Sequence, residues 1–383
     1  MLQTSVIISF FLGLAPCNID IGVHSSKTVK FTLTWSYSLI GCVYSISLVM
    51  FFLGINIVAV PNLYEIPYPN DSVTSMMIIV VLSVQTNIIV VTIIMFYLLF
   101  QRHIIAIGNR LSEFDQKYGD TWLGVCDKTL GDFVKFMAIV MQLFLWIAFF
   151  VTSVMAGDTL FFVASGFGII FCSWFLLQYS LINIIIRDRF KGLNDAISRC
   201  SVSEGNSFYI GSSSNNQLTV EKFITFTRAR AMIYNISLQV SQFYSFPVLL
   251  VIFHCSCSSV SSCYFFLMTL MESKSSSPVI LSVNSSFWTF MELYPIVILS
   301  VSVAMFHEEA KRTADIVYHI IVMCPPDADV VYQLNNFAIE LLHKNVQFTA
   351  CGIFSLDCTL LHSIFGMLVT YLLILLQFKP PEG

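Results

Sequence analysis

The sequence predicts an all-α membrane protein with seven transmembrane helices, its N-terminus in the cytosol and its C-terminus outside the cell. Three observations predict this fold: the composition, the long apolar segments, and the placement of basic residues. Hydrophobic residues make up 56% of the 383-residue chain and charged residues only 11%, whereas soluble domains carry about 25% charged residues. Because no soluble core needs so much apolar surface, the excess is expected to face lipid.

Seven segments are long and apolar enough to cross a bilayer, which requires about 20 predominantly apolar residues. They are residues 35–58, 73–100, 133–155, 160–186, 244–270, 287–306 and 354–378. Only the turn-like Ala156-Gly157-Asp158 separates the third segment from the fourth. The apolar stretch 6–15 is too short to span and has no Lys or Arg before it. It therefore predicts an interfacial or re-entrant helix rather than a signal peptide.

The 19 Lys and Arg residues are distributed unevenly between the two sides of these spans. Lys274 and Lys379 fall on one side, and all the others fall on the opposite side. Since cytosolic loops retain an excess of basic residues, this asymmetry places the N-terminus inside and the C-terminal residues outside. The predicted topology is inverted relative to G-protein-coupled receptors.

N-glycosylation triplets agree in part with this orientation. Those at Asn70 and Asn284 fall in predicted external loops, whereas one at Asn235 falls on the cytosolic side and is interpreted as a chance match. The small net charge of -4 implies no nucleic-acid partner. The lipid bilayer is the partner that the composition implies.

Cysteines and sequence motifs give no indication of catalysis. The 11 cysteines are scattered, mostly through apolar segments, which indicates helix packing rather than a disulfide framework. His254, Cys255, Cys257 and Cys263 are the densest group of potential metal ligands, but they lack the paired spacing of a zinc site. No nucleophile elbow, phosphate loop or metalloprotease helix occurs. We therefore expect no metal, no cofactor and no enzymatic activity.

The segments between the spans are too short for a separate soluble domain. Residues 201–217 are rich in Ser, Gly and Asn and predict a flexible loop. Between Val330 and Val346 the apolar residues recur at helical spacing, which predicts an amphipathic helix that leads straight into the seventh span. Such a helix must bury its apolar stripe against its own chain or against a neighbouring subunit.

The seventh span carries a polar stripe. At about 100° per residue, Ser363, Gly366, Thr370, Ile374 and Gln377 lie on one narrow side of the helix. Several subunits placed around an axis could use this side to line an aqueous pore. Small residues also permit close packing between helices, so the pattern alone leaves both interpretations open.

The end of this span resembles the TY-x5-QF signature of insect gustatory receptors. Thr370 and Tyr371 are followed by five apolar residues and then by Gln377 and Phe378. Residues 348–357 also resemble the segment that precedes the signature in that family. The family consists of tetrameric ligand-gated cation channels of chemosensory neurons. The resemblance therefore implies a tastant-gated cation channel here, formed as a homotetramer or as a heteromer with related subunits.

The same resemblance implies roles for individual residues and regions. Gln377 would line the external half of the pore, Phe378 would form its hydrophobic constriction, and Thr370 and Tyr371 would support the pore helix. The implied regions are 1–306, with six spans and a ligand pocket in their outer halves, 307–353, with cytosolic anchor helices, and 354–383, with the pore helix and a short external C-terminus. The implied location is the cell membrane of sensory neuron dendrites.

The signature does not identify the ligand pocket, so its candidates come from the residues themselves. Glu292 lies inside the predicted sixth span, one turn from Trp288, where the two could bind a polar or cationic small molecule. Both lie near the predicted external surface, where a solvated Glu and an interfacial Trp are also ordinary. Other spans contribute four further candidates: Gln85, Trp146, Tyr244 and His254. Interhelical hydrogen bonds are the alternative explanation for Gln85 and His254.

Two other functional classes are compatible with seven spans. A receptor that signals through cytosolic partners, of the G-protein-coupled type, places its N-terminus outside, which opposes the charge pattern. A secondary transporter predicts an internal repeat and broken helices around a midplane site, and neither is evident in the sequence.

Overall fold

The computed structural model describes Leu12, Leu14 and residues 17–26, 28–63, 73–119, 128–157, 159, 162–205, 213–271, 278–323, 328–343 and 346–377. Within these residues, seven helices are long and apolar enough to cross a membrane. They belong to α2 (Leu39–Asn62), α3 (Val73–Leu99), α5 (Lys128–Ala156), α7 (Phe167–Gly205), α8 (Ser213–Met271), α9 (Pro278–Met323) and α11 (Cys358–Gln377). Each overlaps one predicted span, so the seven spans are confirmed. The predicted helix in residues 6–15 lies outside the described residues, apart from Leu12 and Leu14.

The third and fourth spans are separate helices, as predicted. α5 ends at Ala156, and Gly157 follows with a positive φ of 80°, a backbone conformation that glycine adopts without steric cost. A single π-helical turn, η4 (Phe162–Gly166), then leads into α7. The chain therefore leaves the helical conformation at Gly157, between the third and fourth spans.

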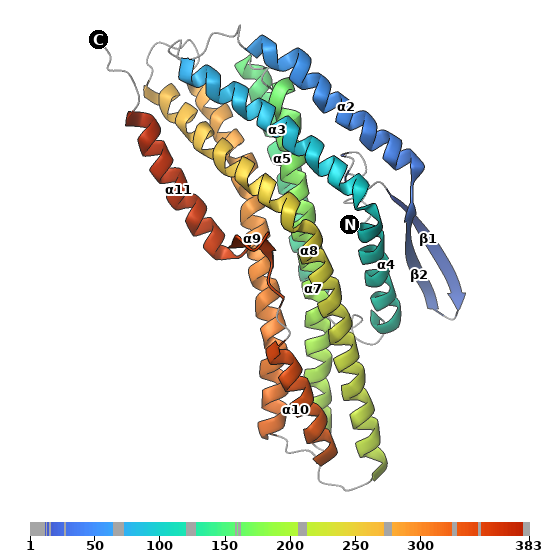
Figure 1. The fold of residues 1–383 in the computed structure, drawn as a ribbon. Coiled ribbons are helices and arrows are strands. Elements are labelled where there is room, and N and C mark those ends of the chain that lie inside the picture. Colours follow the sequence, from blue (N-terminus) through green and yellow to red (C-terminus); the bar gives the residue numbers. More distant parts are fainter. Residues whose placement is uncertain are drawn as a thin grey trace.

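Three helices are much longer than a bilayer requires. α7, α8 and α9 contain 39, 59 and 46 residues, whereas about 20 residues cross the hydrocarbon core. They extend together beyond the shorter helices, and α10 (Ala328–His343) packs against α8 and α9 at that end (Figure 1). The predicted flexible loop 201–217 is consequently too wide, because its two ends lie in α7 and α8. The predicted regional boundary at residue 306 falls inside α9.

The core of the bundle is built around α7. In its apolar window 78% of the residues are buried, against 11% in the window of α11. Trp174, Phe171 and Phe175 are among the largest side chains that are fully buried. A helix that is apolar on all sides can be surrounded either by lipid or by other helices. The burial of α7 shows the second case, because it packs against α5, α8 and α9.

A β-hairpin precedes the first span, and the prediction of an all-α fold is therefore wrong in this region. β1 (Cys17–Ser26) and β2 (Thr28–Tyr37) pair antiparallel, with Cys17 opposite Tyr37. The predicted start of span one at Trp35 lies in β2, and α2 begins at Leu39. The Ser38 hydroxyl caps this helix by accepting a hydrogen bond from the Gly41 N–H at 3.1 Å. The alternating Thr and apolar residues of β2 are the period-two pattern typical of a strand.

The helix α4 (Gln101–Tyr118) follows α3 beyond the span and is held on two sides. The Asn109 side-chain amide bonds both backbone groups of Trp35, accepting from its N–H at 2.8 Å and donating to its carbonyl at 3.1 Å. Asp115 accepts two hydrogen bonds from the Arg189 guanidinium, at 3.1 and 2.6 Å. These contacts tie α4 to the hairpin and to α7.

A second hairpin separates α10 from α11, so the prediction that the amphipathic helix leads straight into the seventh span is wrong. β3 (Thr349–Ala350) pairs with β4 (Phe354–Ser355), and α11 begins only at Cys358. The turn between the strands contains Cys351 and Gly352, whose φ angles of 51° and 71° are incompatible with a helix. The chain is thus redirected before it enters the span.

Candidate functional site

A buried carboxylate lies between α8 and α9. Glu292 is only 1% exposed, which contradicts the interpretation of a solvated acid at the external surface. Its Oε1 accepts a hydrogen bond from Trp288 Nε1 at 2.8 Å, and its Oε2 accepts one from Ser259 Oγ at 3.0 Å. Trp288 Nε1 also lies 3.3 Å from the oxygen of Ser258. Trp288 and Glu292 meet because positions i and i+4 share one face of a helix.

No basic side chain forms an ion pair with Glu292 in the part of the chain that the structure describes. A buried carboxylate is costly when no cation compensates it, so it rarely serves packing alone. Its environment is built from hydrogen-bond donors and aromatic rings. Among the described residues, Glu292 is therefore held in the bundle by neutral donors.

Aromatic side chains of α5 cover Trp288. Phe149 packs edge-to-face against it, with ring centroids 5.0 Å apart. Trp146 lies on the same helix, packs against this cluster, and donates its indole N–H to Ser173 Oγ at 3.1 Å. Gln142 donates to the same hydroxyl at 3.2 Å, while its Oε1 is buried without a partner among the described residues. The structure therefore places Trp146 against the cluster that contains Trp288.

His254 contacts α3 through Thr86. Its Nε2 lies 3.3 Å from Thr86 Oγ1, and that hydroxyl donates its single hydrogen to the Leu82 carbonyl at 2.7 Å. His254 Nε2 must then be the donor, which leaves Nδ1 as an acceptor. Nδ1 and Gln85 Nε2 are both buried with no partner in the described parts of the chain. Ser258, which contacts Trp288, lies one helical turn beyond His254 on α8.

Tyr244 does not join this group. Its ring stacks on Tyr179 at 4.3 Å between centroids, and Phe175 and Tyr97 surround the pair at 5.7 and 6.5 Å. Along α8 it is separated from Ser258 by about 21 Å at 1.5 Å per residue. The prediction that Tyr244 forms a wall of the same cavity is wrong, because it belongs to an aromatic core nearer the other end of the span.

Sequence reasoning missed the polar residues that complete the cluster. Ser258 and Ser259 lie in a Ser-rich part of α8, where hydroxyls ordinarily bond their own helix. Gln142 is an isolated amide in an otherwise apolar helix, and that isolation was a usable signal. In the described residues, no three His, Cys, Asp or Glu converge as metal ligands, so the Cys residues near His254 form no such site.

The helix α11 is the least covered of the spans. Its polar stripe, Ser363, Gly366, Thr370 and Gln377, is exposed, and Ile374 is 39% exposed. The hydroxyls of the stripe bond their own helix, Ser363 to the Thr359 carbonyl at 3.1 Å and Thr370 to the Gly366 carbonyl at 2.8 Å. Tyr371 is 54% exposed, so about half of its side chain is left uncovered by the described residues. Phe378, the predicted constriction, lies outside the described residues.

The glycosylation candidates differ in outcome. Asn284 lies inside α9 and is 6% exposed, and its Oδ1 accepts hydrogen bonds from Thr152 at 3.0 Å and Ser153 at 3.1 Å. A glycan has no access to this nitrogen, so the prediction for Asn284 is wrong and the residue joins α9 to α5. Asn70 lies outside the described residues.

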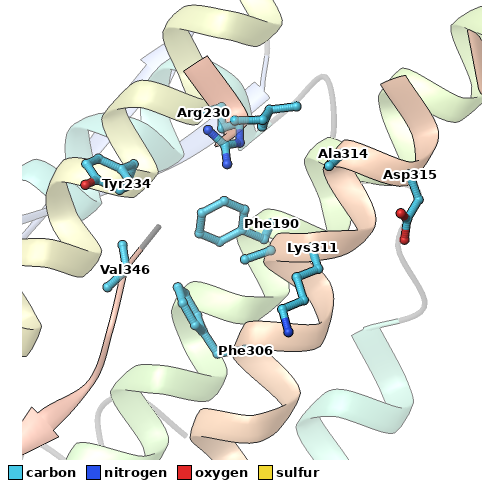
Figure 2. A pocket seen from close by; sticks show the side chains of 10 residues that line it. Phe190, Arg230, Tyr234, Phe306, Lys311, Ala314, Asp315 and Val346 are labelled. Atoms are coloured by element: carbon cyan, nitrogen blue, oxygen red, sulfur yellow. The ribbon is translucent and has the colours of Figure 1, made fainter. Parts of the chain in front are cut away.

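The far end of the bundle contains a separate cavity of about 360 Å³. Apolar side chains of α7, α9 and α10, with Val346 beyond α10, form most of its wall, and Arg230, Lys311 and Asp315 contribute charges of both signs (Figure 2). The Arg230 guanidinium also lies 5.9 Å from the centroid of the Phe337 ring on α10. This cavity lies where α10 docks, far from Glu292.

Comparison with known proteins decides the family. The family described as 7tm Chemosensory receptor matches residues 2–381. The chain belongs to this family. It is accordingly a multi-pass membrane protein of chemosensory receptor type, and the resemblance seen in the TY-x5-QF stretch is confirmed.

Relatives within the chemosensory receptors include several gustatory receptors of Drosophila melanogaster. Putative gustatory receptor 2a is 31% identical over 141 residues, which are 32% of this chain and 33% of that receptor. Putative gustatory receptor 28b is 39% identical over 90 residues, 23% of this chain and 19% of that receptor. The gustatory receptor for bitter taste 66a is 39% identical over 54 residues, 14% of this chain and 10% of that receptor. The matched segments thus span a third or less of these relatives.

Solved structures show the same fold. The insect olfactory receptor OR5 from Machilis hrabei superposes with a TM-score of 0.65 over 99% of this chain and 98% of that chain, at 13% sequence identity. Its complex with eugenol superposes with a TM-score of 0.62 over 98% of this chain and 97% of that chain, at 14% identity. At this identity the comparison extends to the fold alone.

Proposed function

We propose that this chemosensory receptor is a subunit of a tastant-gated, non-selective cation channel, in which four copies surround a pore lined by α11. One observation carries the proposal: α11 is barely covered by its own chain, and its exposed sides are partly polar. Thr370 and Gln377 lie there together with His362 and Ser363. Lipid does not solvate such groups, whereas a water-filled pore does.

The contrast with α5 supports this interpretation. α5 is also largely uncovered, but its exposed side chains from Phe133 to Met155 are all apolar. That pattern is what a lipid-facing helix requires. The exposed surface of α11, in contrast, includes polar side chains. This helix packs on α8 and α9, and its buried residues include Leu360 and Ile364. The rest of its circumference is available to copies of the same chain.

We further propose that the N-terminus is cytosolic and that 307–353 forms the cytosolic anchor region. The basic segments meet at one end of the bundle through ion pairs: Arg189 with Asp115, Lys135 with Asp188, and Arg312 with Asp195, at 2.6, 2.6 and 3.4 Å. The positive-inside rule assigns this end to the cytosol. The orientation opposes the G-protein-coupled topology, and membership of the chemosensory receptor family supports a location in the membrane of sensory neuron dendrites.

The proposed tastant site is the cluster of Trp288, Glu292 and Trp146. Within the described residues, polar atoms without a partner belong to Gln85 on α3, Gln142 on α5 and His254 on α8, and buried polar atoms ordinarily have partners. A ligand that supplies donors and acceptors would satisfy them. Olfactory receptor OR5, with the same fold, has been solved with the small aromatic molecule eugenol, and this supports a small-molecule ligand here. We expect no chemical conversion of the ligand.

Whole-cell recording after heterologous expression tests the proposal. Tastant panels of sugars, alkaloids and amino acids should evoke a cation current. Gln377→Ala and Phe378→Ala should change conductance or leak with unchanged surface expression, because both would act on the permeation path. Unchanged currents in both variants would contradict the pore assignment, and an extracellularly accessible tag on Met1 would contradict the topology.

A further inference from the structure

A groove of about 510 Å³ lies between the junction of α3 with α4 and the adjacent face of α8. One part of its wall is aromatic, formed by Phe96, Phe100 and Phe243, with Phe96 4.6 Å from Phe100 and 5.3 Å from Phe243 between ring centroids. The other part carries His103 and Arg110. The groove is therefore amphiphilic. None of its lining residues belongs to the proposed tastant site or to α11.

The two parts lie at different depths relative to the bilayer. Phe96 lies within the span of α3, which ends at Leu99. Arg110 follows Phe100 by ten residues of helix, which corresponds to about 15 Å along α4. The aromatic part is thus at the level of acyl chains and the cationic part at the level of headgroups. A long arginine side chain readily reaches toward that boundary.

The positive charge of Arg110 has no counter-charge among the described residues. Arg110 and His103 are exposed and form no ion pair or side-chain hydrogen bond within the described residues, and no acidic side chain lines the groove. Arg189, Lys135 and Arg312 at the same end of the bundle are all paired with carboxylates. An anion is the ligand that this arrangement favours.

A hydrogen-bond acceptor completes the site. Gln239 lines the groove from α8, and its Oε1 is buried with no partner in the described parts of the chain. A hydroxyl-bearing headgroup would supply the missing donor. We propose that this groove binds an anionic phospholipid with a hydroxylated headgroup, such as phosphatidylglycerol or phosphatidylinositol, from the leaflet on the basic side. Its phosphate contacts Arg110 and His103, and an acyl chain covers the three phenylalanines.

Native mass spectrometry of the purified full-length receptor tests this proposal. The protein is equilibrated with phosphatidylglycerol or with phosphatidylcholine of the same acyl composition. Wild type should retain phosphatidylglycerol in preference, and Arg110→Gln should weaken that retention about fivefold to tenfold. Arg102→Gln is the matched control, because Arg102 is an exposed cation on the same helix that does not line the groove. Equal retention by wild type and Arg110→Gln would overturn the proposal.

Two further measurements separate the site from its alternatives. Arg110→Lys keeps the charge and should keep most of the preference, whereas Ala106→Trp should fill the groove and abolish it at constant charge. Glycerol 1-phosphate carries the anionic group without acyl chains, and we expect it not to bind. Binding of this soluble phosphate as tight as that of the lipid, or retention of phosphatidylcholine equal to that of phosphatidylglycerol, would refute a phospholipid site. None of these outcomes depends on channel activity.

Discussion

Ser245 on α8 holds Cys351 in the turn that precedes α11. Its Oγ accepts a hydrogen bond from the Cys351 N–H at 2.7 Å and donates to the Thr349 carbonyl at 3.1 Å. Cys351 has a φ of 51°, a conformation that costs a non-glycine residue free energy and needs support from its surroundings. The same helix carries Ser259, which bonds Glu292. α8 therefore contacts both the proposed tastant site and the entrance to the proposed pore helix.

Removing the Ser245 hydroxyl should loosen this turn. Ser245→Ala deletes two hydrogen bonds and leaves a strained backbone without its partner, which we expect to cost about 1–3 kcal/mol of unfolding free energy. Thermal unfolding of the purified receptor should show a lower midpoint, and the tastant dose-response should shift. Ser261→Ala is the control, because that hydroxyl bonds only within its own helix, to the Cys257 carbonyl. Equal effects of the two variants would exclude a special role for Ser245.

The carboxylate of Glu292 should determine which tastants act. Glu292→Gln keeps an acceptor for the Trp288 indole but cannot ionise beside a cationic ligand, so responses to cationic amines should fall by about tenfold or more while neutral tastants are affected less. Dose-response curves for an amine and a neutral aromatic ligand measure the difference. Glu308→Gln, an exposed acid on the same helix, should leave both curves unchanged. A uniform loss for both ligands would indicate a structural role instead.

Gly168 allows α7 to approach α3. A Cβ at this position would lie 2.3 Å from Thr86 Cγ2, and Thr86 cannot rotate freely because its hydroxyl bonds Leu82 and His254. Gly168→Ala should therefore destabilise the receptor by about 1–3 kcal/mol and lower surface expression. Gly54→Ala meets nothing within 4 Å and should stabilise α2 by up to about 1 kcal/mol. Similar surface labelling of the two variants would contradict this packing.

The outcome for individual residues shows what sequence reasoning can reach. Long apolar windows identified every span, because lipid imposes length and composition directly. Trp288 and Glu292 were paired correctly, because spacing on one helix determines their contact. The prediction that Tyr244 lies near Trp288 and Glu292 was wrong, because that distance depends on how α5, α8 and α9 align. The hairpin before Cys358 is held by hydrogen bonds from Ser245 on α8. The local sequence around α11 could not predict these tertiary contacts.

Asp357 should stabilise the start of α11 in a pH-dependent way. It precedes the span as its N-cap, accepting a hydrogen bond from the Thr359 N–H at 2.9 Å. The hydrogen bond from the Thr359 hydroxyl lowers the pKa of the Asp357 carboxyl below its ordinary value, and the Thr359 N–H makes a smaller contribution in the same direction. Because the unfolded pKa is about 3.9, the charge-dependent stabilisation is complete above about pH 4 and is lost as the pH falls through the lower folded pKa.

Thermal unfolding at several pH values checks this sign. Asp357→Ala should lose about 1 kcal/mol at pH 7, whereas Asp357→Asn keeps the acceptor and should lose less. The difference between wild type and Asp357→Asn should be constant from pH 6 to 8 and shrink below about pH 4. A difference that grows on acidification would contradict the assignment.

Cysteine accessibility of α11 tests the pore most directly. In a background with the exposed Cys351 and Cys358 replaced by Ser, Thr370→Cys and Gln377→Cys are treated with a cationic methanethiosulfonate during tastant application. Phe144→Cys, at a 57% exposed site on α5, is the lipid-facing control. We predict that current through the Thr370→Cys and Gln377→Cys channels falls irreversibly while the Phe144→Cys current persists. Persistent current in both α11 variants, with the reagent shown to label them, would contradict a pore lined by this helix.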